Sequence, residues 1–138
     1  MKNLDFKVIK CIYKAGTPLK VGQIARKLNI PHSTIGSCVK RLEEKNLINY
    51  IRYKPVHLTE KGKLLALELI RHAQLLEVLL YESLGLTTED AHSESDKVNL
   101  LFSCKTINQI CKKYNHPKKC PCGEEILSLS GCSCNEGH

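Results

Sequence analysis

Residues 21–42, VGQIARKLNIPHSTIGSCVKRL, decide the fold. Apolar residues recur at helical spacing from Val21 to Leu28, and a second apolar stripe runs from Ile35 to Leu42. Asn29-Ile30-Pro31 interrupts the two stripes, because proline cannot continue a helix and restricts the residue before it. Two short helices joined by so tight a break are typical of a helix-turn-helix.

The flanking segments extend this motif on both sides. Apolar residues recur at helical spacing between Phe6 and Tyr13, which predicts a helix before the motif. Residues 47–53 are rich in β-branched and aromatic side chains, Lys54-Pro55 predicts a turn, and residues 56–58 return as a second strand. The sequence therefore predicts a winged helix-turn-helix.

A long helix is expected after the wing, capped by Thr59 and ending near Gly85. Its apolar residues cover more than one face, which favours packing against a second copy of the chain over burial by the same chain. The predicted fold class is mainly α. We divide the chain into a winged helix-turn-helix DNA-binding domain at 1–62, a helical dimerisation and metal-binding domain at 63–115, and a short Cys-rich C-terminal tail at 116–138.

The net charge of +7 is distributed unevenly along the chain. Residues 1–63 hold 14 Lys and Arg against 4 Asp and Glu, whereas residues 64–138 hold 7 against 10. Basic side chains on one module gain free energy by displacing counterions from phosphates, so we expect the first half to bind double-stranded DNA. The alternative is a solvated basic surface without a ligand.

The second helix of such a motif enters the major groove, with short side chains at its start near the bases and cations further along near phosphates. The residues expected to contact the bases are His32, Ser33, Thr34 and Ser37. Those expected to contact the backbone are Lys40 and Arg41 on the helix and Arg52 and Lys54 on the wing.

Other classes of protein are disfavoured by the sequence. No apolar run approaches the length of about 20 residues that a membrane helix needs, and the N-terminus lacks the apolar core of a signal peptide, so we expect a cytoplasmic protein with no membrane partner. No nucleophile–base pair or phosphate loop stands out, so we expect neither an enzyme nor a small-molecule substrate. Eight cysteines without an export signal indicate metal binding or redox chemistry rather than a disulfide scaffold.

Six of those cysteines lie in the last 35 residues. Cys120-Pro-Cys122 and Cys132-Ser-Cys134 are two pairs separated by nine residues, and four thiolates suit Zn²⁺ or an iron–sulfur cluster. Free or redox-paired thiols, or simple packing, are the alternatives. Cys104 and Cys111 are two helical turns apart and either contribute ligands or, as we favour, pack in the core.

Two stretches carry a family resemblance, HLTEKGKLLALELIRHAQLLEVLLYESLGL at 57–86 and HPKKCPCGEEI at 116–126. With the helix-turn-helix before them, they resemble the iron-dependent (diphtheria toxin) repressor family, in its short manganese-responsive form without an SH3-like domain. The resemblance implies a homodimeric repressor of metal homeostasis that binds Fe²⁺ or Mn²⁺ and a palindromic operator.

The resemblance also implies a metal site, which is degenerate in this chain. Glu77 and His92 match family ligand positions, and Asp96 stands where the family uses Glu or Cys. Other family ligand positions are occupied here by non-ligands, namely Lys7, Lys10, Ala73, Asn99 and Leu100.

Two consequences follow from these departures. His72 sits one residue away from the family's histidine position and about 140° around the helix from Glu77, so we expect it at the surface or an interface rather than as a ligand. Lys7 or Lys10 is expected to oppose a bound cation, and could instead pair with Glu94 or Asp96 and take the place of the metal.

The leading hypothesis is therefore a metal-dependent, dimeric transcriptional regulator. The first alternative is a regulator that senses redox state through an iron–sulfur cluster or through thiols. The second, of another class, is an adaptor that binds protein or handles metal and does not bind DNA.

Overall fold

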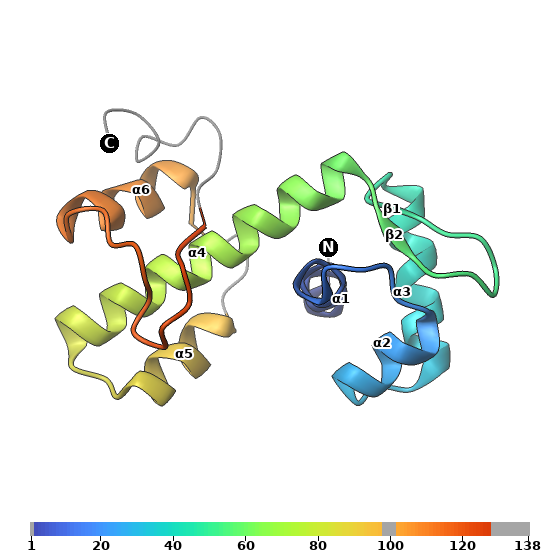
Figure 1. Ribbon diagram of the computed structural model, residues 1–138, viewed down its shortest axis with the longest axis horizontal. Helices are drawn as coiled ribbons and strands as arrows, with labels where there is room; N and C mark the ends of the chain where they lie inside the picture. The colour runs from blue at the N-terminus through green and yellow to red at the C-terminus, as the bar shows by residue number, and fades with distance from the viewer. Residues whose placement is uncertain (1, 98–101, 128–138) are drawn as a thin grey trace. The chain divides into compact units, whose positions relative to one another are not determined.

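The computed structural model describes residues 2–97 and 102–127, and the chain divides into two compact units, Met1–Ala66 and Leu67–His138 (Figure 1). Unit 1 is the predicted winged helix-turn-helix. Unit 2 contains most of the long helix and the two helices that follow it. The mainly helical fold class is thus confirmed.

Three helices build unit 1: α1 (Asn3–Ala15), α2 (Val21–Leu28) and α3 (His32–Glu44). Gly16 ends α1 with a φ of 72°, and Asn29 ends α2 with a φ of 55°, both in the left-handed region that terminates helices. The apolar stripes of the three helices meet in a common core. Its fully buried members include Val8, Ile9, Ile24, Ile35, Val39 and Leu42.

The wing has shorter strands than the sequence predicts. Strand β1 (Ile48–Asn49) pairs antiparallel with β2 (His57–Leu58), and Val56 forms a further bridge with Leu19. The predicted strand over 47–53 is therefore wrong in its second half. Directly after β1 the Tyr50 N–H donates to the Glu43 carboxylate, and the Lys54 N–H donates to the Ile51 carbonyl in a turn.

Helix α4 (Glu60–Leu84) contributes its first residues to unit 1 and the rest to unit 2. Thr59 caps it as predicted, accepting the Gly62 N–H at 3.0 Å. Helices α5 (Thr88–Asp96) and α6 (Cys104–Lys113) complete unit 2, each begun by a hydroxyl cap, Thr87 for α5 and Ser103 for α6.

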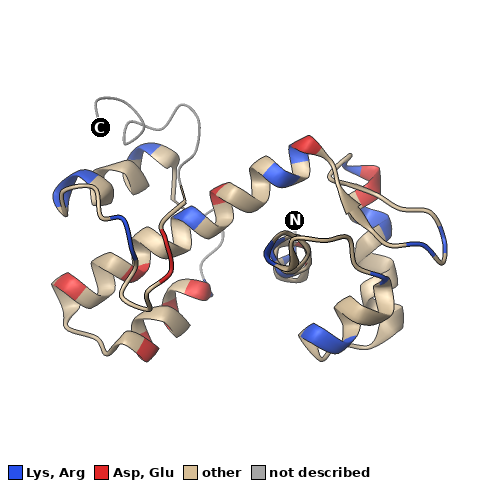
Figure 2. Cartoon of the chain, viewed as in Figure 1, with Lys and Arg blue, Asp and Glu red and all other residues tan. Residues whose placement is uncertain are grey.

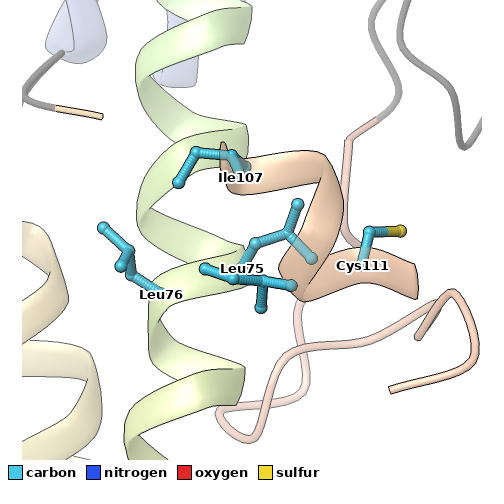
Figure 3. Packing of buried hydrophobic residues seen from close by; sticks show 5 residues of the cluster. Leu75, Leu76, Ile107 and Cys111 are labelled. Atoms are coloured by element: carbon cyan, nitrogen blue, oxygen red, sulfur yellow. The ribbon is translucent and has the colours of Figure 1, made fainter. Parts of the chain in front are cut away.

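The core of unit 2 lies between α4 and α6 (Figure 3). It is formed by buried Leu75 and Leu76 from α4 and by Ile107, Ile110 and Cys111 from α6. Burying an aliphatic side chain of this size contributes about 1.5–3 kcal/mol. The packing role favoured for Cys111 is thus confirmed, and α6 is fixed along one side of α4.

Residues 116–127, the described part of the predicted Cys-rich tail, pack on α4. The Gln74 side chain donates to the Glu125 carbonyl at 2.7 Å and accepts the Leu127 N–H at 2.9 Å. Arg71 donates to the Leu127 carbonyl at 2.8 Å. These bonds fix the approach of the tail to the helix, and therefore the place of Cys120 and Cys122.

Candidate DNA interface and metal centre

The predicted base-contacting side chains share one open surface of α3. The helix buries Ile35, Cys38 and Val39 in the core of unit 1. The exposed residues are His32, Ser33, Thr34, Ser37 and Lys40. This arrangement leaves short polar groups near the start of the helix and a cation further along; their contact with DNA stays a prediction.

The wing loop adds exposed cations, Arg52 and Lys54. Both line a groove of about 510 Å³ that also takes in His32 from α3. Lys20 and Arg26, which sequence reasoning did not single out, line the same groove. Figure 2 shows basic residues on the wing and acidic residues on α5, in agreement with the uneven charge of the two halves of the sequence. The groove is the strongest candidate for contact with phosphates.

Arg41 has a structural partner within unit 1. Its Nη2 lies 2.8 Å from Oδ1 of Asp5, a carboxylate only 1% exposed, and the Cys38 thiol donates to the same oxygen at 3.0 Å. Burial raises the pKa of Asp5, but the hydrogen bonds from Arg41, Cys38 and the Lys2 N–H together outweigh it and leave the pKa below its usual value. The pairing with Asp5 does not show whether Arg41 also contacts a DNA phosphate, and that contact stays a prediction.

In unit 2 a second buried carboxylate, Glu77, is the centre of a group of potential metal ligands. Its Oε1 lies 2.8 Å from Nδ1 of His92 on α5, and its Oε2 accepts the Cys122 N–H at 3.0 Å. The Cys120 and Cys122 Sγ atoms are 2.7 Å apart, and the ligand atoms of Glu77 and the two cysteines all lie within 4.8 Å of one another. Glu77 is 1% exposed.

A tight turn in the tail presents these cysteines to the helix. The Gly123 N–H donates to the Cys120 carbonyl at 2.8 Å, and the Cys120 N–H donates to the Glu124 carbonyl at 2.9 Å. Gly123 has a φ of 98°, a conformation that favours glycine. Lys119 and Glu125 pair as an antiparallel bridge just outside this turn. The Cys-Pro-Cys-Gly sequence therefore forms a compact corner, with the Cys122 N–H directed at Glu77.

The electrostatics of the group are those of a site that exchanges protons for a cation. Burial raises the pKa of Glu77, but hydrogen bonds from the Cys122 N–H, His92 and the two thiols outweigh it and leave the pKa below its usual value. Burial, with help from Cys122 and Glu77, raises the pKa of Cys120 to about 12. Without a bound cation the carboxylate is thus charged and the Cys120 thiol protonated; a cation that binds must displace the thiol proton.

The donor set fits a divalent transition metal. Two sulfur atoms, an imidazole nitrogen and a carboxylate oxygen are the ligands that Zn²⁺ and iron accept.

Four of the predicted metal ligands are thus brought together in one place. The sequence assigned Glu77 and His92 to a family site and Cys120 and Cys122 to a Cys site, whereas the structure makes them neighbours. Asp96 is exposed at the end of α5 and lies outside this group.

The remaining sequence predictions are not tested by the described residues. Cys132 and Cys134 lie outside the described residues, as do Asn99 and Leu100. The pairing of Lys7 or Lys10 with an acidic residue of α5 joins residues of the two units and stays a prediction.

One prediction in unit 2 is wrong: His72 is not at the surface. It is 1% exposed, because it lies on a side of α4 that α6 covers. Its Nε2 is 3.6 Å from the Cys104 Sγ and 3.9 Å from Oε1 of Glu68. The helical spacing of Glu68 and His72 was visible in the sequence, but Cys104 joins them only through the packing of α6.

Among the described residues, no helix is both long and apolar enough to cross a bilayer.

The winged helix and the ligand group define a class, the winged-helix regulators of transcription that carry a metal-binding domain. Two family models match in the corresponding places. The MarR family model covers residues 2–53, and the model described as "Iron dependent repressor, metal binding and dimerisation domain" covers residues 59–128. The chain belongs to the iron-dependent repressor family, a family of repressors and not of enzymes.

Individual relatives agree with this assignment. The iron-dependent repressor IdeR of Mycobacterium tuberculosis is 32% identical over 113 residues, which are 82% of this chain and 49% of IdeR. The HTH-type transcriptional regulator MntR of Oceanobacillus iheyensis is 27% identical over 99 residues, which are 72% of this chain and 67% of MntR. The chain spans about half the length of the IdeR proteins it matches.

Solved structures share the fold. The hypothetical protein SSo2273 from Sulfolobus solfataricus aligns with a TM-score of 0.77 and 26% identity, covering 93% of this chain and 100% of its own. ScaR with bound Zn²⁺ aligns with a TM-score of 0.75 and 27% identity, covering 90% of this chain and 59% of its own.

Proposed function

We propose that this chain is a metal-dependent transcriptional repressor of metal homeostasis that binds a palindromic operator as a homodimer. The observation that carries the proposal is the group of Glu77, His92, Cys120 and Cys122 around one buried carboxylate, in the unit that matches a metal-binding and dimerisation domain. A cation bound there would favour the conformation that binds DNA. The concentration of the ion would then set the fraction of the protein that binds DNA.

The four residues of this group would hold the metal, and the ion supplies positive charge that no member of the group carries permanently. The family resemblance favours Fe²⁺ or Mn²⁺, whereas two sulfur ligands favour Zn²⁺ or Fe²⁺ over Mn²⁺. ScaR, a relative by structure, has been solved with Zn²⁺ and with Cd²⁺. We propose Fe²⁺ or Zn²⁺ as the preferred ion.

The DNA contacts are assigned to unit 1. The exposed face of α3 enters the major groove, and the cations of the wing groove, Arg52, Lys54, Lys20 and Arg26, neutralise phosphates. A homodimer with twofold symmetry presents two such units, which is why the operator is expected to be palindromic. Exposed Tyr81 and Leu84 near the end of α4 are apolar surface available for dimerisation.

The test begins with selection of operator sequences from random duplex DNA in the presence of Fe²⁺, Mn²⁺ or Zn²⁺ under anaerobic conditions. Fluorescence anisotropy then measures affinity for the selected duplex with each ion and with a chelator. We expect at least about tenfold tighter binding with metal, loss of that gain in Glu77→Gln, and a wild-type response in the control Glu89→Gln, which changes an exposed charge on α5. Equal affinity with metal and with chelator contradicts the proposal.

The assignment of the DNA-binding face has its own test. Lys40→Ala removes one exposed cation from α3, so the slope of log affinity against log salt concentration becomes shallower by about one. Lys112→Ala, an exposed cation on α6, is the control and leaves the slope unchanged. If the chain shows no salt-dependent binding to duplex DNA, it is an adaptor without DNA-binding activity.

One observation favours a second function, redox sensing. The Cys120 and Cys122 Sγ atoms lie 2.7 Å apart, so a peroxide could oxidise the two thiols to a disulfide, taking up their two protons and two electrons to form two molecules of water. Under this alternative, peroxide abolishes operator binding in the chelated protein and a reductant restores it. A visible absorption spectrum of the anaerobic protein would instead indicate an iron–sulfur cluster.

A further inference from the structure

A second group of potential ligands in unit 2 is separate from the one around Glu77. Glu68 and His72 lie one helical turn apart on α4, and Cys104 is the first residue of α6. Their ligand atoms lie within 4.8 Å of one another. Glu77 follows Glu68 by nine residues, which on a helix is about 13 Å along the axis and on the opposite side. The two groups therefore cannot share one ion.

Two of the three separations within this second group match those of a tetrahedral metal site. The Cys104 Sγ is 3.4 Å from Oε1 of Glu68 and 3.6 Å from Nε2 of His72. Bonds of about 2.3 Å to sulfur and about 2.0 Å to nitrogen and oxygen place tetrahedral ligand atoms about 3.3–3.6 Å apart. The third separation, from Glu68 to His72, is 3.9 Å. The Glu68 side chain is 31% exposed, so it has room to approach.

The orientation of the His72 ring points to the same chemistry. The ring is 1% exposed, and among the described residues its Nδ1 has no hydrogen-bond partner. Its polar neighbours, the carboxylate and the thiol, therefore both lie on the Nε2 side.

A catalytic relay would require a different arrangement. In a nucleophile–histidine–carboxylate triad the carboxylate orients one ring nitrogen while the nucleophile contacts the other. Here Glu68 and Cys104 both approach Nε2. Convergence of three different donors on one point fits a shared cation rather than proton transfer through the ring.

We propose that Glu68, His72 and Cys104 form a second metal site in this chain, selective for Zn²⁺ or Co²⁺ over Mn²⁺. One sulfur, one nitrogen and one oxygen ligand suit these borderline ions, and water completes the tetrahedron on the exposed side of Glu68. The ion would fasten the start of α6 to α4. This site does not depend on the repressor function, because it uses none of the residues assigned to DNA or to the first centre.

The experiment is a Co²⁺ titration of the full chain in which the four tail cysteines, Cys120, Cys122, Cys132 and Cys134, are replaced by Ser. We expect one Co²⁺ per chain, with the near-ultraviolet charge-transfer band of a cobalt–thiolate bond. Adding Cys104→Ser abolishes the band, whereas adding Cys11→Ser, at a half-buried cysteine of unit 1, leaves it unchanged. A band that survives loss of Cys104, or is absent from the starting variant, overturns the proposal.

A second measurement guards against misfolding of the multiple variant. In the otherwise wild-type chain, Glu68→Gln changes a partly exposed side chain, and we expect Zn²⁺ stoichiometry to fall by one, or one dissociation constant to rise at least about tenfold. The control Glu82→Gln, on an exposed part of α4, leaves both values unchanged. Unaltered Zn²⁺ binding in Glu68→Gln contradicts the site. Since no DNA is present, failure here is distinct from failure of the proposed repressor.

Discussion

Among the described residues, each unit of the chain buries one carboxylate almost completely, and the two are stabilised in different ways. Asp5 in unit 1 is paired with the guanidinium of Arg41 and accepts from the Cys38 thiol and the Lys2 N–H. Glu77 in unit 2 is in contact with an imidazole, a peptide N–H and two thiols. The first carboxylate is neutralised by a permanent cation of its own chain, whereas the identified partners of the second carry none.

This difference separates a structural carboxylate from a proposed metal ligand. A buried charge that already has a hydrogen-bonded counter-ion gains little from a second cation. A buried charge surrounded by imidazole and thiols gains a great deal from a metal ion, and the same groups become additional ligands once their protons leave. The two acidic residues are almost equally buried, so the chemistry of their neighbours distinguishes them.

The largest expected effect is on the structural pair. Asp5→Asn removes the charge that compensates Arg41, and we expect the free energy of unfolding to fall by about 3 kcal/mol, at the low end for a buried pair because Arg41 is 32% exposed. Urea denaturation of the chelated protein, followed by circular dichroism, measures the change. The control Glu44→Gln, at an exposed position of α3, shifts it by less than about 0.5 kcal/mol. If the free energy of unfolding fell by no more in Asp5→Asn than in Glu44→Gln, Asp5 would not be a structural carboxylate and the contrast with Glu77 would fail.

The next effect concerns the ligand carboxylate. With Zn²⁺ at a hundred times its dissociation constant, the wild-type chain gains about 2.7 kcal/mol of stability by mass action, and Glu77→Gln loses most of that gain. In chelator the same variant changes stability by less than about 1 kcal/mol, because no permanent counter-ion is left unpaired. Paired denaturation curves with and without the ion test this. A large loss in chelator would make Glu77 a structural residue like Asp5.

Cys122→Ser tests which ion the group around Glu77 prefers. Replacing sulfur by oxygen removes a soft ligand, so we expect Zn²⁺ affinity to fall about tenfold relative to Mn²⁺. Competition with a chromogenic chelator measures both ions, and Cys11→Ser serves as the control. No loss for either ion would mean that Cys122 contributes through its backbone N–H alone, which serine retains.

The smallest effect is the pH dependence of the structural pair. The pKa of Asp5 lies below its ordinary value of 3.8, so its ionised form favours the folded state. The part of the Asp5→Asn loss that comes from ionisation of Asp5 is therefore fully present above the ordinary pKa and disappears as the pH falls through the lowered one. Denaturation in chelator at pH 2 to 6 checks this. A difference that persists undiminished at the acid end would show that ionisation of Asp5 is not its source.

Local pattern was enough for most of the fold but not for the ligand groups. The break at Pro31 and the hydroxyl cap at Thr59 are local signals, and the helices they bound form as predicted. The wing strand was overestimated, because aromatic and β-branched composition does not reveal that the Tyr50 N–H is bound to Glu43. At Tyr50 the hydrogen bond to the Glu43 side chain replaces the strand pairing that local propensity favours.

The ligand groups depend on contacts between distant residues. Glu77 and Cys122 are 45 residues apart and were assigned to different sites, since nothing local indicates that the tail returns to α4. His72 was placed outside the core because its position was judged on α4 alone. Cys104 and Cys111 share a helix face, yet α6 brings one beside polar residues and the other into the apolar cluster.

The Gln74 amide pairs with the chain at Glu125 and Leu127 as a peptide group of a neighbouring strand would, donating on one side and accepting on the other. It thereby sets the register of a segment more than 50 positions away without contributing a ligand. Anchor and ligands are carried by different residues. The turn between Lys119 and Glu125 is therefore held in place by a residue that is not a proposed ligand. Residue 122, a proposed ligand, can change, and with it the preferred ion, while the hydrogen bonds of Gln74 keep the segment aligned with α4.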